Sequence, residues 1–378
     1  MKVILSVEAV RFPLTGIGRY SYELARGLMA SDDVEDLKLL SGLRFLPTLP
    51  VAQSHSSAQH GLKRLVQGSG FLTGIYQRGM PLLRALTLRA MGDHIYHSPN
   101  FFLPPFPGAK IATFHDLSAF KWSECYDPVK VRFLKKELLK TLKNSDALIT
   151  DSEYTRRELA DFSGWPLEKI HAVPLASSPE FFPRTSIEVK AVLEKYRLRY
   201  HGYTLYVGTI EPRKNLVRLL DAYGRLPLAM RQRWPLVFSG YRGWRSEDVH
   251  RRIDQAEKQG WAHYLGFLPA DELPELYAGA RLFVFPSLYE GFGLPVLEAM
   301  SSGVPVVCSN SSSLPEVVGA AALMSDPNDV VGLSENLEIG LQDDLWRKRA
   351  ILAGLARANG FSWHQCVNST IKVYRSFQ

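Results

Sequence analysis

The sequence is poor in cysteine, with three residues, Cys125, Cys308 and Cys366, in a chain of 378. An odd number of widely separated cysteines forms neither a disulfide framework nor a zinc site with closely spaced ligands. This usage excludes a small disulfide-stabilised secreted domain. It is typical of a reducing compartment, so we expect a cytoplasmic protein.

Long hydrophobic runs are also missing. A membrane span needs about 20 consecutive apolar residues, and the best window, residues 71–91, is interrupted by Arg78, Arg84 and Arg89. The first residues lead directly into a short apolar segment, without the hydrophobic region and cleavage site of a secretory signal peptide. We therefore expect neither a transmembrane helix nor a signal peptide.

Several motifs of common enzyme classes are absent. The sequence has no Asp-x-Asp, no pair of histidines at metal-ligand spacing, no Gly-x-x-x-x-Gly-Lys-Ser/Thr phosphate loop and no Gly-x-Ser-x-Gly elbow. These absences argue against a phosphate-loop nucleotide hydrolase and a serine hydrolase. They also predict chemistry that runs without a bound metal.

Acidic residues are missing from residues 37–92, although this stretch carries seven basic residues, as many as the net charge of +7 of the whole chain. Leucines at helical spacing, among them Leu62, Leu65, Leu83 and Leu86, lie beside these cations. The combination favours an interfacial helix on an anionic membrane surface; a mobile acceptor loop followed by an ordinary solvated helix is the alternative. No nucleic-acid-binding motif accompanies the charge, so nucleic acid is not expected as a partner. The seven basic residues are Lys38, Arg44, Lys63, Arg64, Arg78, Arg84 and Arg89.

The residues that are present have the balance of a soluble globular protein, with 46% hydrophobic and 22% charged residues, and the length favours two or three domains. Short apolar runs alternate with amphipathic segments, which is typical of βαβ units with a parallel sheet. The predicted strands are Lys2–Val7, Leu37–Ser41, His94–His97, Lys110–His115, Ala147–Thr150, Ile170–Val173, Thr204–Val207, Leu236–Ser239, His263–Leu265, Leu282–Phe285, Val304–Cys308 and Ala322–Met324. The predicted helices are Gly18–Met29, Val129–Lys143, Glu153–Phe162, Leu216–Leu226, Ala270–Ala278 and Pro295–Ser301.

The predicted strands stop near Pro174 and resume near Tyr203. The segment Pro174–Pro183 contains three prolines and shows neither the periodicity of a strand nor that of a helix, which indicates a linker. We therefore expect two Rossmann-like α/β domains, residues 1–180 and 181–360. Ligands of such sheets bind at the carboxyl ends of the strands, so two facing domains would enclose a central cleft.

The most specific motif is the segment from Glu290 to Glu298, which follows a predicted strand and opens a helix. Gly291 and Gly293 allow close backbone approach, and amides at a helix N-terminus attract anions. The two carboxylates are suited to accept hydrogen bonds from sugar or ribose hydroxyls. A helix-capping turn with two solvated carboxylates is the alternative interpretation.

A second motif, Gly208–Asn215, also lies between a predicted strand and a helix. Its adjacent Arg213 and Lys214 supply fixed positive charge for a diphosphate, unless the segment is an ordinary exposed basic turn. Because turns of one parallel sheet meet at one edge, we expect this motif and Glu290 to lie close together.

Two motifs of the first half also follow strands. Gly16 and Gly18 resemble the start of a dinucleotide-binding loop, but the third glycine of that fingerprint is absent. They are candidates for a phosphate or sugar contact, or for close helix–strand packing. His115 ends another strand and is expected to face the cleft, oriented by Asp116, unless it is a structural histidine.

Together these residues resemble the family 4 retaining glycosyltransferases, whose GT-B fold has two Rossmann-like domains facing a cleft. Glu290 to Glu298 matches the family's E-x7-E motif, and Gly208–Asn215 matches its diphosphate-binding turn. Phe361–Trp363 opens a final helix, residues 361–378, which in this family packs back on the first domain. The match is collinear over essentially the whole chain. It departs from the family at Thr15-Gly16, where many members carry Gly-Gly.

The resemblance implies a role for each matching residue. Arg213 and Lys214 would stabilise the departing diphosphate, Glu290 would hold the transferred sugar, Glu298 would hold the ribose, and His115 would contact the sugar near its anomeric carbon. The residues implied to act in catalysis are His115, Arg213, Lys214 and Glu290. Those implied to bind the donor are Gly16, Gly18, Arg213, Lys214, Gly291, Phe292, Gly293, Leu294 and Glu298, with backbone near Phe267 and Leu268 reading the base.

The activity implied is that of a retaining, metal-independent hexosyltransferase with no cofactor, whose co-substrate is a nucleotide-diphosphate sugar such as GDP-mannose or GDP-rhamnose. The acceptor would be a glycan or a polyprenyl-diphosphate-linked glycan in O-antigen assembly, at the inner face of the cytoplasmic membrane. A nucleotide-sugar epimerase or hydrolase of the same fold and a non-catalytic sugar-nucleotide-binding protein are the alternatives. A hydrolase with two carboxylates would leave Arg213 and Lys214 without a role.

Overall fold

Two β-sheets organise the chain in the computed structural model, which describes residues 1–50 and 83–378. The first sheet has the order β3-β2-β1-β4-β5-β6-β7, and all its strands are parallel except β3, which pairs antiparallel with β2. Its strands are β1 (Lys2–Ser6), β2 (Asp36–Ser41), β3 (Arg44–Leu46), β4 (Ile95–Ser98), β5 (Ala109–Phe114), β6 (Ala147–Thr150) and β7 (Ile170–Ala172). The helices and turns around it are α1 (Gly16–Met29), α4 (Ser118–Lys121), η2 (Ser123–Cys125), α5 (Pro128–Asn144), α6 (Glu153–Ser163) and η3 (Leu167–Lys169).

The second sheet is parallel throughout, with the order β10-β9-β8-β11-β12-β13. Its strands are β8 (Thr204–Val207), β9 (Leu236–Ser239), β10 (Ala262–Gly266), β11 (Leu282–Phe285), β12 (Val306–Ser309) and β13 (Ala322–Ser325). The accompanying helices and turn are α7 (Lys190–Lys195), η4 (Pro212–Lys214), α8 (Leu216–Arg225), α9 (Leu228–Arg233), α10 (Glu247–Lys258), α11 (Leu273–Ala278), α12 (Leu294–Ser301), α13 (Leu314–Val318), α14 (Val330–Gln342) and α15 (Asp344–Ala358).

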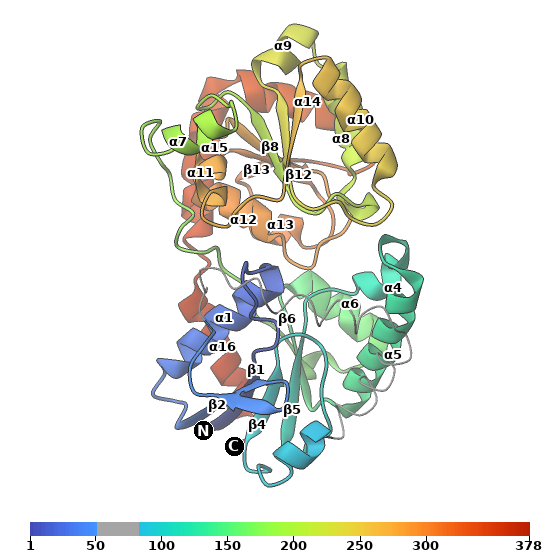
Figure 1. The fold of residues 1–378 in the computed structure, drawn as a ribbon, viewed down its shortest axis with the longest axis vertical. Coiled ribbons are helices and arrows are strands. Elements are labelled where there is room, and N and C mark those ends of the chain that lie inside the picture. The colour runs from blue at the N-terminus through green and yellow to red at the C-terminus, as the bar shows by residue number, and fades with distance from the viewer. Residues whose placement is uncertain (51–82) are drawn as a thin grey trace, which may run out of the picture.

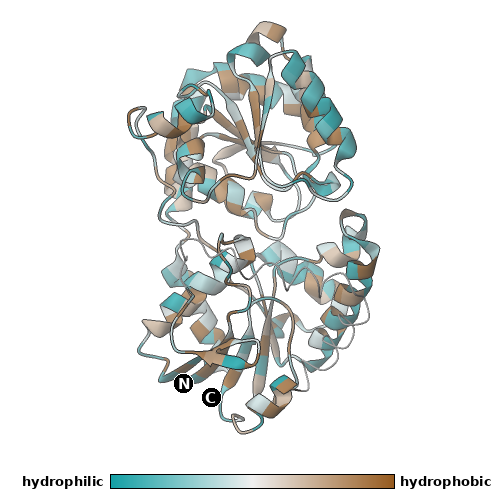
Figure 2. Cartoon of the chain, viewed as in Figure 1, coloured by the Kyte–Doolittle hydropathy of each residue, from teal (hydrophilic) through white to brown (hydrophobic). Residues whose placement is uncertain are grey.

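The two sheets belong to two lobes that lie one above the other along the long axis of the molecule (Figure 1). Every residue of the central strands β11 and β12 is buried, because helices cover both faces of a parallel sheet. Figure 2 shows hydrophobic residues in these central strands and alternating hydrophobic and hydrophilic residues on the surrounding helices. The fold class predicted from the alternating pattern, two Rossmann-like parallel-sheet units, is confirmed.

The last helix, α16 (Trp363–Arg375), returns to the first lobe and lies beside α1 (Figure 1). The helices pack closely, because a side chain at Gly27 of α1 would overlap Val367 of α16. Ser362 accepts a hydrogen bond from the backbone nitrogen of Gln365 and caps the helix. The chain therefore crosses between the lobes twice, at the proline-rich segment and before α16.

The acid-free stretch is described at residues 37–50 and 83–92; Leu62, Leu65, Lys63, Arg64 and Arg78 lie outside the described residues. The prediction that Arg84 belongs to an outward cationic face is wrong. Its guanidinium donates to the Glu8 carboxylate and to the carbonyl oxygen of Gly42, 3.1 Å away. Arg84 therefore ties the helix at residues 83–88 to the first sheet.

The neighbours of Arg84 point outward. Leu83, Leu86 and Arg89 are exposed. Within residues 1–50 and 83–378, no helix has the length and apolar character needed to cross a membrane.

Candidate active site

The turns that carry the two strongest motifs meet because their strands are neighbours. β8 leads into η4 with Arg213 and Lys214, and the adjacent β11 leads into the loop with Glu290. Asn215 joins the two turns: its side chain donates to the carbonyl oxygens of Pro286 at 3.0 Å and Pro327 at 2.7 Å. The left-handed backbone of Asn215, with φ of 61°, ends η4 and begins α8. The expectation that parallel strands bring these turns together is confirmed.

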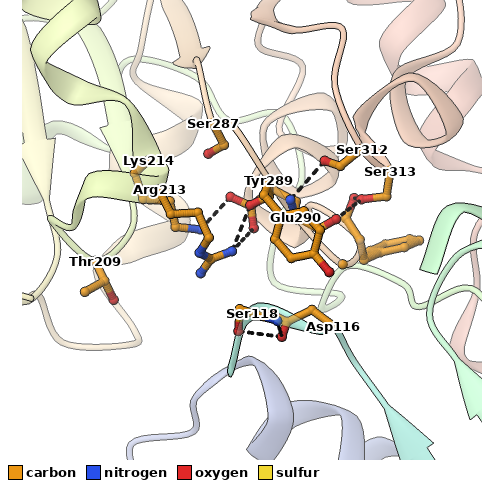
Figure 3. Close-up of polar contacts among 12 residues, drawn as sticks. Asp116, Ser118, Thr209, Arg213, Lys214, Ser287, Tyr289, Glu290, Ser312 and Ser313 are labelled. Carbon is orange, nitrogen blue, oxygen red and sulfur yellow. Dashed lines mark hydrogen bonds and ion pairs between the residues drawn. The ribbon is translucent and has the colours of Figure 1, made fainter. Parts of the chain in front are cut away.

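At this edge, both cationic side chains point toward Glu290 (Figure 3). Lys214 Nζ lies 2.5 Å from Glu290 Oε1, and Arg213 Nη1 lies 3.4 Å from Glu290 Oε2. Arg213 also donates to the Glu211 carboxylate at 2.8 and 3.0 Å and to the carbonyl oxygen of Tyr289 at 2.8 Å. All four charged side chains are buried, so the site holds two cations and two carboxylates away from bulk water.

Burial and mutual attraction set the protonation of this cluster. Burial would raise the pKa of Glu290, but the charges of Lys214 and Arg213 outweigh it and lower that pKa below its usual range. Burial would lower the pKa of Arg213, and Glu290 with Glu211 raises it instead. The pKa of Lys214 is lowered by burial and by the adjacent Arg213. An additional anion at this turn would favour the charged form of Lys214, which burial and Arg213 oppose.

Two serines form hydrogen bonds with the backbone of Glu290, and they were not predicted from the sequence. The backbone nitrogen of Glu290 donates to Ser312 Oγ at 2.9 Å, and Ser313 Oγ donates to the carbonyl oxygens of Glu290 at 3.0 Å and Phe292 at 2.8 Å (Figure 3). Both serines follow β12, the next strand of the sheet. The signal that could have found them is the polar run Ser309–Ser313 directly after a buried strand.

The glycines after Glu290 place the loop against the first domain. A side chain at Gly291 would overlap the carbonyl oxygen of His115, and its Cβ would lie 2.8 Å from the His115 carbonyl carbon. Gly293 has φ of 111° and is the N-cap of α12, so the amides of the first turn face the cleft edge. Phe292 is buried and meets Phe361 edge-on, with ring centroids 5.8 Å apart.

The glycine loop of the first domain meets this loop from the other side. A Cβ on Gly16 would lie 3.7 Å from Cδ1 of Leu294, so two residues predicted to bind the donor face one another across the domain boundary. Thr15 caps α1 by accepting from the backbone nitrogen of Gly18. Gly18 is a packing position, because its Cβ would lie 2.8 Å from the carbonyl oxygen of Ala9.

His115 is buried, and both nitrogens of its ring are bonded within the protein. Nδ1 lies 2.8 Å from the Asp151 carboxylate, and Nε2 lies 2.8 Å from the carbonyl oxygen of Pro99. Both partners accept hydrogen bonds, so the doubly protonated ring satisfies both. Burial would lower the pKa of His115, but Asp151 raises it above its usual value. A contact of this ring with a donor sugar stays a prediction, and it requires the bond to Pro99 to open.

The expected orienting residue for His115 is therefore wrong: Asp151, not Asp116, binds the ring. Asp116 instead accepts from the backbone nitrogen of Ser118 at 2.8 Å and from its hydroxyl at 2.6 Å (Figure 3). Tyr126 Oη lies 2.6 Å from Ser118 Oγ. The negative charge of Asp116 raises the pKa of Arg213 and so acts across the domain boundary. An acid directly after the neighbouring strand β6 was the signal for Asp151.

Tyr289, next to Glu290, connects the site to the first domain. Its hydroxyl donates to the Glu158 carboxylate and accepts from the backbone nitrogen of Leu117 at 2.9 Å. The carbonyl oxygen of Gly291 accepts from the hydroxyls of Ser152 at 2.7 Å and Thr155 at 3.1 Å. The loop that carries Glu290 is thus bonded to both domains.

Glu298 lies in α12, about one turn after the start of the helix at Leu294. The residue as a whole is half-buried, and the loss of water around its carboxyl group raises its pKa to about 7, against the lowering effects of the Tyr277 hydroxyl and the Arg19 charge. Arg19 belongs to α1 of the first domain, so a charge of the facing domain also affects the pKa of Glu298. Among residues 1–50 and 83–378, no three His, Cys, Asp or Glu side chains are grouped to hold a metal ion.

Comparisons with known proteins agree with this geometry. Residues 200–357 match the family model described as glycosyl transferases group 1. The chain is 44% identical over 379 residues to O-antigen chain mannosyltransferase B of Escherichia coli, which covers 99% of this chain and 100% of the relative. It is 32% identical to the serotype-specific mannosyltransferase WbdA of Escherichia coli, over 71% of this chain and 33% of that longer protein.

Two solved structures share the fold. Anabaena Alr3699/HepE in complex with UDP and glucose has a TM-score of 0.72 at 16% identity and covers 100% of both chains. WaaG, a glycosyltransferase involved in lipopolysaccharide biosynthesis, has a TM-score of 0.69 at 15% identity and covers 99% of both chains. At these identities the likeness concerns the arrangement of the two domains.

Proposed function

Because the chain belongs to the group 1 glycosyl transferases, we propose that it is a mannosyltransferase of O-antigen assembly with GDP-mannose as donor. The observation that carries the transfer chemistry is the meeting of Lys214, Arg213 and Glu290 at one sheet edge. The choice of mannose is supported by the full-length likeness to the Escherichia coli mannosyltransferase.

Transfer of a sugar from a diphosphate develops negative charge on the departing phosphate and positive charge on the ring. Arg213 and Lys214 are fixed cations at the place where the phosphate charge would grow, and preorganised charge favours the transition state over the ground state. Their burial strengthens the effect, because charges interact more strongly where water is excluded. We assign them the diphosphate and its departure.

Glu290 holds the sugar in this proposal. Its carboxylate sits between the cations and the domain boundary, and its backbone is fixed by Ser312 and Ser313. Once a diphosphate neutralises Lys214, the carboxylate is released to accept hydroxyls of the mannose. The ribose of the nucleotide would bind Glu298, which lies in the helix α12 that follows the Glu290 loop.

We propose retention of anomeric configuration by front-face attack, in which the departing phosphate takes the proton of the acceptor hydroxyl. In this step the glycosidic C–O bond to phosphate breaks, the bond from the acceptor oxygen to the anomeric carbon forms, and the acceptor proton ends on GDP. Because the proposal assigns the Glu290 carboxylate to the hydroxyls of the sugar, it is not assigned to attack the anomeric carbon, and we propose a mechanism without a glycosyl-enzyme.

We propose that Arg213 and Lys214 take the place that a divalent metal has in other transferases. Their two positive charges at the turn after β8 support this assignment. Treatment with EDTA is expected to leave the rate unchanged, and an enzyme that loses all activity and regains it with Mn²⁺ would overturn the assignment.

The decisive test of the function is incubation of the whole chain with GDP-mannose, GDP-rhamnose, UDP-glucose and UDP-galactose, each with and without a mannose-terminated acceptor. We expect GDP release that requires the acceptor, and an α-linked mannoside by NMR. GDP-mannose breakdown that needs no acceptor would indicate a hydrolase, and an altered sugar nucleotide without transfer would indicate an epimerase. Binding without any turnover would indicate a non-catalytic protein.

We propose further that the acceptor is a polyprenyl-diphosphate-linked glycan at the inner face of the cytoplasmic membrane. The exposed Leu83, Leu86 and Arg89 support a contact with an anionic surface. Sedimentation with vesicles of phosphatidylglycerol should decrease for the variant Leu86→Ser, Arg89→Glu. Exchange of the ion pair as Glu8→Arg, Arg84→Glu is the control, and equal sedimentation of all three proteins would remove the membrane contact.

A further inference from the structure

A cavity of about 480 Å³ opens between the two domains, beside the turn that carries Arg213. The first domain contributes residues from η2 to the first turns of α5, and the second contributes the loop before α10. The lining residues are Ser123, Glu124, Tyr126, Pro128, Val131, Arg132, Trp244, Arg245 and Glu247. A volume between roughly 300 and 1,000 Å³ is usual for small-molecule sites.

The lining has the chemistry of a carbohydrate site. Trp244 is 47% exposed, and within the described residues neither an aromatic ring nor a cation stacks on its indole. A large exposed aromatic ring offers a flat apolar surface with a polar edge, which suits the apolar face of a pyranose ring. The four charged side chains of the lining, Glu124, Arg132, Arg245 and Glu247, form no ion pair with another described residue. Their donors and acceptors are therefore available for hydroxyls.

The signs of these charges identify the class of ligand. Two arginines and two glutamates cancel, so the cavity has no excess charge of the kind that binds a phosphate. The cationic site proposed for the diphosphate, at Arg213 and Lys214, is adjacent to this cavity. A neutral ligand with many hydroxyl groups fits the cavity better than a nucleotide does.

The wall that carries Trp244 is rigidly joined to the diphosphate turn. Gly243 donates its backbone nitrogen to the carbonyl oxygen of Ile210 at 2.9 Å, and Ile210 donates to the carbonyl oxygen of Tyr241 at 2.8 Å. A Cβ on Gly243 would lie 2.6 Å from the Ile210 carbonyl oxygen, so the backbone at Gly243 is in direct contact with the backbone at Ile210. The backbone next to Trp244 is therefore bonded to the turn that carries Arg213.

The opposite wall leads toward the reaction centre. Tyr126 lies in the cavity and bonds to Ser118, which bonds to Asp116. The charge of Arg213 lowers the pKa of Tyr126, against the larger raising effect of burial, so the two groups are close. A glycan whose inner sugar occupies the cavity would thus extend past Tyr126 toward Asp116, which lies below the cluster of Arg213 and Glu290 in Figure 3.

We propose that this cavity, between Trp244 of the second domain and Arg132 of the first, is a subsite for an inner sugar of the acceptor glycan. The proposal rests on the proposed transferase function and adds the place and residues that select a longer acceptor. Because its walls belong to different domains, an acceptor in the subsite also holds the two domains together.

The test compares acceptors of two lengths with GDP-mannose as donor: an α-mannose monosaccharide and an α-linked mannotriose, each with the same octyl aglycone. In the wild type we expect a lower KM for the trisaccharide. Trp244→Ala should raise the KM for the trisaccharide about tenfold, the equivalent of about 1.4 kcal/mol, with the KM for the monosaccharide and for GDP-mannose unchanged. Trp244→Phe should recover most of the loss, because it keeps a flat ring.

Arg132→Ala, on the facing wall, should give the same selective loss for the trisaccharide. Trp165→Ala is the matched control, since Trp165 lines a different cavity at residues 145–171 and 376–377. A rise in the KM for GDP-mannose in Trp244→Ala would assign the cavity to the nucleotide and overturn the proposal. Equal KM values of Trp244→Ala and wild type for the trisaccharide would also overturn it.

A failure of the proposed function gives a different result. In that case the wild type transfers no mannose to either acceptor. Calorimetric titration of the whole wild-type chain with mannotriose then reports on the cavity alone. Binding that is lost in Trp244→Ala supports the subsite, and absence of binding in the wild type overturns it.

Discussion

Gly291 is the position at which one added methyl group should separate folding from catalysis. It is buried between the domains, and its φ is not positive, so alanine fits the local backbone. The Cβ of Gly291→Ala would overlap the His115 carbonyl oxygen and lie 2.8 Å from the carbonyl carbon and 3.0 Å from Asp116 Cβ. The obstacle is backbone, which cannot rotate away as a flexible side chain does.

The displacement can be worked out from these contacts. Ordinary contacts of a Cβ begin at 3.4 Å, so the His115 carbonyl carbon must retreat from 2.8 Å by at least 0.6 Å, and the overlapping oxygen by more. The hydrogen bonds from Ser152 and Thr155 to Gly291 lengthen with it. Misplacement of reacting groups by about 1 Å can cost 10²-fold in rate. We therefore expect kcat/KM of Gly291→Ala to fall about 10²-fold.

Three measurements check this reasoning together. Steady-state transfer from GDP-mannose gives kcat/KM, calorimetric titration gives the Kd for GDP, and thermal unfolding gives Tm. We expect a large loss in kcat/KM with little change in the Kd for GDP, because the nucleotide would bind the second domain. Gly224→Ala is the matched control, since its Cβ meets nothing within 4 Å. Wild-type kcat/KM in Gly291→Ala would refute the idea that this close approach serves catalysis.

The remaining predictions concern charge, a contact between the domains, and pH. Arg213→Ala and Lys214→Ala each remove a charge-assisted contact worth about 1.5–3 kcal/mol, so kcat/KM should fall at least about tenfold; unchanged kinetics in both would contradict the diphosphate assignment. Tyr289→Phe deletes the hydroxyl that binds Glu158 and a backbone amide, and a hydrogen bond worth about 1 kcal/mol predicts a roughly fivefold fall in kcat with the Kd for GDP unchanged. A loss of GDP affinity without a fall in kcat would argue against a role of this contact between the domains in the transfer step. The pKa of Glu298 is raised from 4.5 to about 7, so the folded state binds more protons between these values and stability falls as pH rises through this window. Urea unfolding at pH 5 and pH 7.5 should show a smaller difference in Glu298→Gln than in wild type, and an equal difference would place the titration elsewhere.

The fold followed from patterns that are local in the sequence. Buried parallel strands are continuous apolar runs, and β8, β9, β11 and β6 begin and end at the predicted residues. The helix predicted at Val129–Lys143 is α5, Pro128–Asn144. The predicted helices did not include the long helices α10, α14 and α15 or the short helices α4, α7, α9 and α13. The predicted strands did not include β3, a short antiparallel edge strand.

The adjacency of Arg213, Lys214 and Glu290 could be predicted, since it follows from the geometry of any parallel sheet. The partner of His115 could not be read from the nearest acid in the sequence. Asp116 and Asp151 both follow strand ends, and the strand order of the folded sheet decides which one reaches the ring. Proximity along the chain is a poor guide where the partner comes from the next strand.

Contacts between the domains were the least predictable part. Gly291 was interpreted as freedom for a ligand to approach, and the structure shows the approach of another backbone at that position. Tyr289 and Ser152 have no pattern that marks them, because a single hydroxyl in a loop becomes functional only through the surface that faces it. Such contacts depend on how two independent folding units dock.

The pairing of Glu290 with the two cations explains why the glutamate motif and the basic turn occur together. An unpaired charge buried in a protein costs several kcal/mol, so Arg213 and Lys214 need a carboxylate before a donor binds. A diphosphate supplies that negative charge itself and competes with Glu290 for Lys214, whose pKa is already lowered by its surroundings. We infer that the same carboxylate then turns to the sugar, so that a donor is gripped at its phosphate and its hydroxyls in one exchange. A chain with only one of the two motifs would bury either two cations without this carboxylate or a carboxylate without these cations.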